Sequence, residues 1–192
     1  PRPGPIWLED LPRILARSGG KPDPHGAYKV TLEVLLECGN HCHTNTLIVL
    51  RALFREIGGM DEMSRWEYDR DLYLRLIDRA TMMLYLPITV ARHNIPDPAR
   101  AANMTTAISE FERRLFQIRL LDRAALFARH PAIRHNARLN KAYTLKRIAE
   151  LLAGEGRYGD AAFYAREALG AGPTFKWAGY TAWCMLRASL GR

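Results

Sequence analysis

The sequence predicts an α+β fold in which strands and short helices come first and a purely helical region follows. Two apolar runs, Thr46–Arg51 and Met82–Leu86, are compact enough to predict strands. After Thr105, apolar residues recur at helical spacing through the remainder of the sequence. We therefore expect a mixed domain over residues 1–105 and an all-α region over residues 106–192.

The first part of the chain is punctuated by glycine and proline. Residues 1–30 are rich in both, so we expect irregular structure there, apart from a helical turn around Leu8–Ala16. The first predicted strand leads into a short helix over Ala52–Ile57. Gly58-Gly59 is a typical helix stop and ends it.

A longer helix is predicted from Asp69, where leucines recur on one face and charged residues on the other. The second strand, Met82–Leu86, is ended by Pro87, and Ile88–Ala91 reads as a third strand. The segment His93–Pro98 contains two prolines and predicts a link to the helical region. That region is expected to hold four helices, over residues 109–128, 131–153, 158–169 and 175–190.

Composition excludes several classes of protein. The 192 residues are 48% hydrophobic and 25% charged, which is typical of a globular domain and excludes wholesale disorder. No apolar run approaches the ~18 residues that a membrane span needs, and no signal peptide is recognisable. The cysteine number is odd, at three, which argues against a disulfide framework. We therefore expect a cytoplasmic protein, peripheral at the inner face of the membrane if it binds one.

The positive charge is concentrated in one stretch. The net charge is +8, and residues 113–150 alone carry ten basic residues against two acidic ones. An anionic membrane surface or a phosphorylated acceptor is the partner expected for such a face, unless nearby carboxylates pair with it. Nucleic acid is not expected, because the aromatic residues of this stretch, Phe116, Phe127 and Tyr143, lie at the spacing of core residues and are not interleaved as base stacking needs. The basic residues are Arg113, Arg114, Arg119, Arg123, Arg129, Arg134, Arg138, Lys141, Lys146 and Arg147.

A second stretch combines carboxylates with aromatic rings. Trp66 and Tyr68 lie among five acidic residues that fall within eleven positions. Helix capping explains one or two acidic residues at a helix start, but not so many beside exposed rings. A ring that stacks on a sugar face, next to a carboxylate that accepts from hydroxyls, is what a saccharide site needs. The five are Asp61, Glu62, Glu67, Asp69 and Asp71.

These residues also carry a family resemblance. The runs RALFREIGGMDE (51–62), WEYDRDLYLRL (66–76) and LYLP (84–87) match, in order and spacing, the acceptor half of family 2 glycosyltransferases of the GT-A fold. That family typically shows a strand ending in Arg, a helix, a GGFDE turn, an ED-x-DLxLRL helix start and a YxP strand. The resemblance covers residues 31–95 and implies a partial GT-A-like sheet with flanking helices.

The resemblance implies an inverting transfer of a sugar from a nucleotide sugar to a glycan, lipid or protein acceptor. Asp69 aligns with the family's catalytic base, and Asp71 is the alternative. A divalent cation, Mg or Mn, would assist the departing diphosphate, with its main ligands outside this chain and His93 as the local candidate. The residues expected to line the acceptor site are Trp66, Glu67, Tyr68, Asp71 and Asp61.

Two departures from the family pattern stand out. The pair that aligns with Glu-Asp is Tyr68-Asp69, so Glu67, one residue earlier, is expected to take part of the missing role. The family's metal-binding D-x-D follows a hydrophobic strand, whereas Asp69-Arg-Asp71 opens a helix. The sequence is therefore interpreted as the C-terminal, acceptor-side part of such an enzyme, without the nucleotide-binding half.

We do not expect a zinc site in the segment before the first predicted strand. The spacing of its cysteines and histidines, Cys38, His41, Cys42 and His43, fits no standard zinc pattern.

A second resemblance lies in the helical region. Residues 156–173 are similar to the turn and second helix of a tetratricopeptide repeat, with small residues where two helices approach and Pro173 at the end. An ordinary helical hairpin is the alternative interpretation. The rival function is accordingly a non-catalytic helical adaptor whose basic face binds anionic partners. The residues in register are Gly156, Tyr158, Ala161, Tyr164, Ala168, Leu169 and Pro173.

Overall fold

The computed structural model describes residues 21–37, 44–64, 66–88 and 108–191, with single positions at 16 and 90. The chain divides into two compact units, unit 1 (Pro1–Ile95) and unit 2 (Pro96–Arg192). The boundary predicted at residue 105 lies outside the described residues. Most described residues are helical and a small antiparallel sheet is present, so the α+β class is confirmed at this level.

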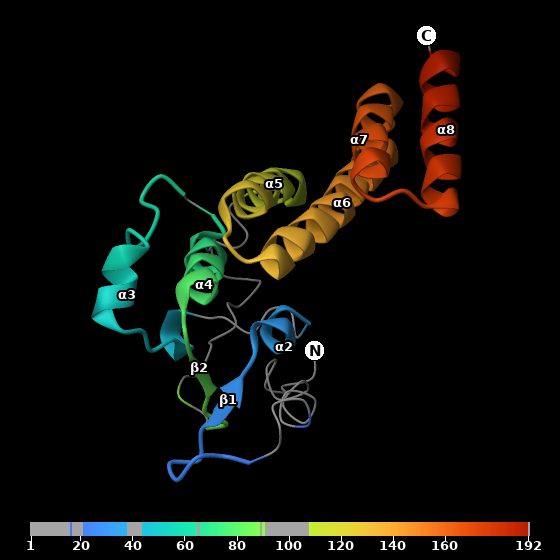
Figure 1. Ribbon diagram of the computed structural model, residues 1–192. Helices are drawn as coiled ribbons and strands as arrows, with labels where there is room; N and C mark the ends of the chain where they lie inside the picture. The colour runs from blue at the N-terminus through green and yellow to red at the C-terminus, as the bar shows by residue number, and fades with distance from the viewer. Residues whose placement is uncertain are drawn as a thin grey trace. The chain divides into compact units, whose positions relative to one another are not determined.

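The sheet of unit 1 joins two short strands that lie far apart in the sequence (Figure 1). Strand β1 (Tyr28–Val30) pairs antiparallel with β2 (Met83–Tyr85), with Lys29 opposite Leu84. The strand predicted at 82–86 is thus confirmed as β2. The irregular structure predicted for residues 1–30 is wrong at its end, because three residues with strong or neutral β-propensity find a partner strand.

A tight turn delivers the chain into β1. The Asp23 carboxylate accepts from the amides of His25 and Ala27, at 2.8 and 2.9 Å, and Gly26 has a φ of +81°. Such a side-chain-to-backbone turn is a common use of Asp. Helix α2 (Leu32–Glu37) follows β1 and buries Leu32, Val34 and Leu35.

The strand predicted at Thr46–Arg51 is wrong. Residues Thr44–Thr46 form a 3-10 turn, η1, and residues 47–50 belong to no helix or sheet. Ile48 is 97% exposed and Leu50 is 78% exposed. The composition of this run favours a strand, but the run pairs with no strand among the described residues. At the third predicted strand, Ile88 and Val90 are not in a strand, and Thr89 and Ala91 lie outside the described residues.

Helix α3 (Arg51–Glu56) confirms the predicted helix and ends at the two glycines as expected. Gly58 and Gly59 have φ values of +81° and +69°, which only glycine adopts without strain. A Cβ at Gly59 would also approach the Phe54 ring at 3.3 Å. Helix α4 (Tyr68–Arg79) begins one residue before the predicted start and buries Leu72, Leu76 and Ile77.

Arg75 of α4 holds the turn that follows α3. Its Nη1 donates to the carbonyls of Ile57 and Gly59, at 2.7 and 2.8 Å. Its Nε donates to Asp71 Oδ2 at 2.7 Å, and Nη2 lies 2.6 Å from the same oxygen. Asp71 is only 5% exposed. A buried carboxylate thus neutralises a guanidinium that satisfies the free carbonyls at the end of a neighbouring helix.

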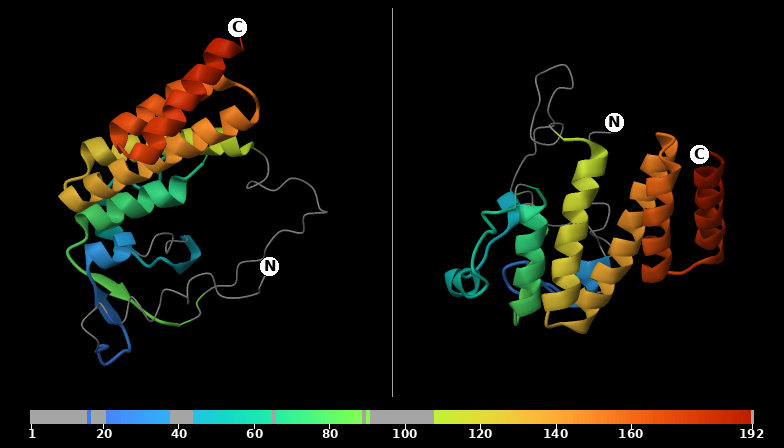
Figure 2. Two further views of the ribbon diagram at one scale, coloured as in Figure 1. Left: turned by 90° about the vertical axis from the view of Figure 1, so that its right-hand side faces the viewer. Right: turned by 90° about the horizontal axis from the view of Figure 1, so that it is seen from above.

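Unit 2 consists of long helices packed in sequence order (Figure 2). All four predicted helices are confirmed: α5 (Glu110–Phe127), α6 (Pro131–Gly154), α7 (Tyr158–Ala171) and α8 (Phe175–Leu190). Their starts follow sequence signals. Ser109 and Glu112 form a capping box at α5, a proline begins α6, and Thr174 caps α8.

The core of unit 2 is built from small residues that allow close helix approach. Ala149 of α6 and Ala165 of α7 are fully buried, beside the buried Trp177 of α8. The indole Nε1 of Trp177 donates to the carbonyl of Ala165 at 2.9 Å, and the Thr181 hydroxyl reaches the same carbonyl at 3.3 Å. Helices α7 and α8 are therefore joined by polar contacts as well as by packing. Such close packing is what the tetratricopeptide-like pattern predicts.

Replacing Arg75 with Ala should destabilise unit 1 by about 3 kcal/mol, because the buried carboxylate of Asp71 would lose this guanidinium and the carbonyls of Ile57 and Gly59 would lose their donor. The measurement is amide hydrogen exchange at Gly58 and Gly59, which should become faster by about 100-fold or more. Arg70→Ala is the control, since Arg70 faces Glu67 at 3.8 Å on the surface and its loss should cost less than about 1 kcal/mol. Equal exchange in the two variants would contradict the role given to Arg75.

Candidate functional site

The candidate site is the turn that enters α4 and the first turn of that helix. The structure describes Asp61, Trp66, Glu67, Tyr68, Asp69 and Asp71, all of which belong to unit 1. Trp66 to Asp71 form one continuous run across the start of α4. His93, the predicted local metal ligand, lies outside the described residues.

The backbone at Glu67 is left-handed. Its φ and ψ are +60° and +18°, and it is the only residue other than glycine with a positive φ among those described. This conformation costs a residue with a side chain free energy, so it persists where surrounding contacts enforce it. The Glu67 carbonyl accepts from the amide of Asp71 at 2.9 Å, which ties the turn to the helix.

Asp69 occupies the first turn of α4 and is partly exposed. Its Oδ1 accepts from the amide of Arg70 at 2.8 Å. Tyr68 beside it is 37% exposed, and Trp66 is partly buried. A partly exposed carboxylate and two aromatic rings, one exposed and one partly buried, are thus adjacent in sequence at one helix start.

The other carboxylates hold the local structure. Asp71 is engaged by Arg75, as described above. Asp61 organises the preceding turn: its Oδ1 accepts from the amide of Met63 at 3.0 Å, and its Oδ2 accepts from the Ser64 hydroxyl at 3.3 Å. Two of the predicted acceptor-binding residues therefore have structural partners, which sequence reasoning had not assigned to them.

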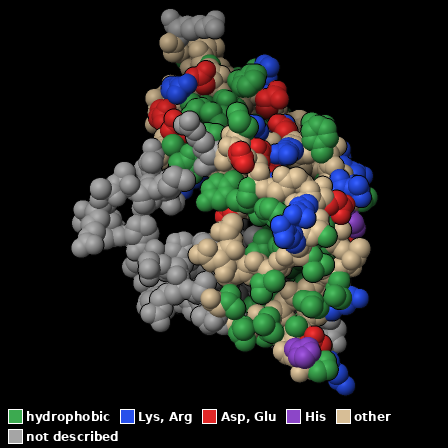
Figure 3. All heavy atoms as spheres, turned by 90° about the vertical axis from the view of Figure 1, so that its left-hand side faces the viewer, with side chains coloured by type: hydrophobic (Ala, Val, Ile, Leu, Met, Phe, Trp, Pro, Cys, Tyr) green, Lys and Arg blue, Asp and Glu red, His purple; other side chains and the backbone are tan. Residues whose placement is uncertain are grey.

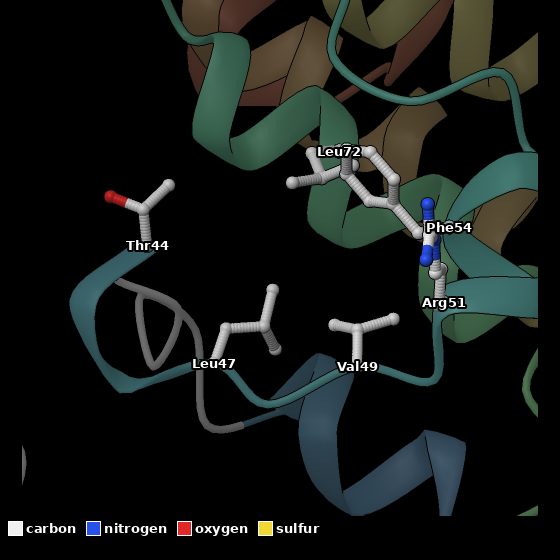
Figure 4. Close-up of a pocket in the computed structure, with 6 residues that line it drawn as sticks. All are labelled: Thr44, Leu47, Val49, Arg51, Phe54 and Leu72. Atoms are coloured by element: carbon white, nitrogen blue, oxygen red, sulfur yellow. The ribbon is translucent and has the colours of Figure 1, made fainter.

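An apolar depression adjoins this helix start. It has a volume of about 410 Å³ and lies between residues 44–50, α3 and α4. Figure 4 shows Leu47 and Val49 pointing from the segment after η1 toward Leu72, with Phe54 and Arg51 of α3 at one end. Leu72 follows Asp69 by three residues, so both side chains project from neighbouring positions on the helix surface. Sequence reasoning missed this depression, because it assigned residues 46–51 to a paired strand.

The described residues contain no group of three His, Cys, Asp or Glu side chains that could hold a metal ion. Cys38, His41, Cys42 and His43 lie outside those residues, as His93 does. Within the described ranges, no helix is both long enough and apolar enough to cross a membrane.

The basic window of residues 113–150 is partly neutralised by carboxylates of unit 2. Arg147 reaches Glu110 and Glu150, and Arg114 reaches Glu110 as well. Lys141 pairs with Asp122. On the face drawn in Figure 3, cationic and anionic side chains are interspersed. Several of the cations that the sequence places together therefore have carboxylate partners on α5 or α6.

Other cations of the window have partners that are not carboxylates. Arg134 donates to the carbonyls of Ala128 and Arg129, both at 2.7 Å, and so holds the end of α5 to the start of α6. Lys146 lies over the Trp177 ring at 5.4 Å, a cation–π contact between α6 and α8.

Comparisons of the chain with protein families, with curated proteins and with solved structures find no match.

Glu110 should titrate far below an ordinary glutamate. Hydrogen bonds from Arg147 and then Arg114 lower the pKa of its carboxyl from 4.5 to about 2. Because the folded-state pKa is depressed, the stabilisation is complete above pH 4.5 and is lost as the pH falls through 2. The measurement is an NMR titration of the Glu110 carboxyl carbon. Arg147→Ala should move the midpoint upward, and a wild-type midpoint near 4.5 would contradict the assignment.

Proposed function

We propose that residues 31–95 form the acceptor-side part of an inverting glycosyltransferase similar to family 2, with the start of α4 as its acceptor site. The observation that carries this proposal is the left-handed backbone at Glu67, in the middle of the aromatic and acidic run. Backbone strain of this kind clusters at functional sites. The sequence resemblance supports the same location independently.

In the proposed reaction, Asp69 accepts the proton of an acceptor hydroxyl as that oxygen attacks the anomeric carbon. The bond between the anomeric carbon and the phosphate oxygen breaks, and the nucleoside diphosphate leaves with the bonding electron pair. Trp66 and Tyr68 orient the acceptor by stacking on its apolar face. The resemblance places the main ligands of the Mg or Mn ion, and the nucleotide-binding half, outside this chain.

The environments of the two aspartates favour Asp69 over Asp71 as the base. Asp71 is 5% exposed and held by Arg75 through two short contacts, so a proton on it would break a buried ion pair. Asp69 is partly exposed and accepts one backbone hydrogen bond. We therefore assign the proton transfer to Asp69 and a positioning role to Asp71.

The apolar depression favours an acceptor with an apolar portion. Leu47, Val49, Phe54 and Leu72 line most of it, with Arg51 at its end (Figure 4). A lipid-linked or aromatic acceptor would fill such a surface and present its hydroxyl near Asp69. Among glycan, lipid and protein acceptors, this observation favours the lipid class.

A helical adaptor is the second candidate. The observation in its favour is the row of four packed helices in unit 2, which includes the tetratricopeptide-like hairpin α6–α7. Its cations for an anionic partner, such as an acidic membrane surface, would be Arg113, Arg119 and Arg138 of the basic window. These three differ from the cations described above, which contact carboxylates, backbone carbonyls or a ring.

Asp69→Asn should lower kcat by at least about 100-fold, the usual effect of removing a general base. The fold should be preserved, because Asn is tolerated at a helix start. The measurement is sugar transfer by the full reading frame that carries this chain. Asp71→Asn is the comparison: it should lower stability, by amide exchange in unit 1, more than it lowers kcat. Near-normal turnover in Asp69→Asn with loss of turnover in stable Asp71→Asn would reverse the assignment.

A further inference from the structure

Helix α8 has two apolar faces. The inner face packs in unit 2 through Trp177, Thr181 and Cys184, which are 7%, 4% and 0% exposed. On the opposite side, positions separated by three or four residues form a continuous stripe without a charged or polar side chain. This outer stripe consists of Phe175, Gly179, Ala182, Trp183, Leu186 and Leu190.

The large residues of the outer stripe are exposed. Phe175 is 100% exposed, Leu190 72%, Leu186 57% and Trp183 43%. Arg187 is drawn toward α7, because it lies over the Tyr158 ring at 4.8 Å and donates to its hydroxyl at 3.3 Å. The other cation of α8, Lys176, adjoins the N-terminal end of the stripe beside Phe175. A helix that is apolar on both sides is normally buried on both sides. Within the described residues, the outer stripe has no cover.

We propose that the outer stripe is the interface of a homodimer in which two copies of α8 pack antiparallel. A twofold axis that passes between Ala182 and Trp183 places each large residue of one copy opposite an apolar residue of the second copy. Phe175 then faces Leu190 of the second copy, Gly179 faces Leu186, and Ala182 faces Trp183. Small residues oppose large ones at two of the three levels, so the stripe is complementary to itself. This surface belongs to unit 2 and does not depend on the glycosyltransferase proposal.

The area of the outer stripe is sufficient for a weak, specific dimer. An aromatic side chain buries about 150–250 Å², and with the two leucines the exposed fractions above amount to roughly 500 Å² per copy if all of this surface is covered. Two copies would then bury about 1,000 Å², the lower bound for a specific interface. We therefore expect a weak dimer that forms as the concentration is raised.

Sedimentation velocity of the 192-residue chain across the micromolar range tests the proposal. The wild type should shift from monomer to dimer with concentration. Leu186→Glu should weaken association by at least about 100-fold, because a charge would be buried without a partner. Leu139→Glu on α6 is the matched control, because the exposed fraction of Leu139, 54%, is similar to the 57% of Leu186. This variant should dimerise like the wild type.

The variant Gly179→Leu distinguishes loss of the dimer interface from loss of the folded structure. A Cβ at Gly179 meets no atom within 4 Å in one copy, so the helix should fold with the larger side chain. In the dimer the added side chain would occupy the space of Leu186 from the second copy, and association should be lost with unchanged helicity by circular dichroism. A wild type that stays monomeric, or equal association in Leu186→Glu and Leu139→Glu, would overturn the proposal.

Discussion

The contact on which unit 1 depends is the buried ion pair of Arg75 and Asp71. Helix α3 is short, and its last carbonyls accept from the amides of Ile57, Gly58 and Gly59 in the turn that follows. Arg75 satisfies two carbonyls of the turn that follows, at Ile57 and Gly59, and places a cation at the negative end of α3. Asp71 makes this possible, because an isolated guanidinium would be costly to bury. One side chain therefore fixes α3, its glycine turn and α4 relative to one another.

Because of this arrangement, Asp71 and Asp69 have different roles, one structural and one available to a ligand. The side chain of Asp71 turns into unit 1 to meet Arg75, and Asp69 is left at the accessible start of the helix. The left-handed Glu67 precedes it and joins the aromatic turn to the helix. The rigid part of the site is thus carried by α4 and the part that would contact a ligand by the turn before it, a common arrangement in binding sites.

The helices of this protein were predictable because their ends carry local signals. Ser109 with Glu112, Pro131 and the pair Gly58-Gly59 mark starts and stops that depend on nearby residues alone. The strands depended on distant residues. Thr46–Arg51 has the composition of a strand, yet residues 47–50 join no sheet, whereas Tyr28–Val30 becomes a strand because Met83–Tyr85 is available to it.

The candidate site was predictable in its residues but not in their division of roles. The sequence places Asp69 and Asp71 two positions apart and makes them equivalent as carboxylates. The spacing of Asp71 and Arg75 indicates a pair on one helix face. It does not indicate that Arg75 also donates to two carbonyls 16 and 18 residues earlier in the chain, contacts that help to bury this pair. Burial therefore decides between the two aspartates, and burial follows from tertiary contacts.

The most direct measurement is an NMR titration of the 192-residue chain with a panel of mono- and disaccharides, because acceptor binding at the start of α4 is the central claim. The account predicts saturable amide shifts at Trp66, Glu67, Tyr68 and Asp69, with millimolar affinity for these small ligands. Trp66→Ala should abolish the shifts while the Arg75 contacts persist. Shifts confined to other residues, or no shift with any saccharide at tens of millimolar, would contradict the account.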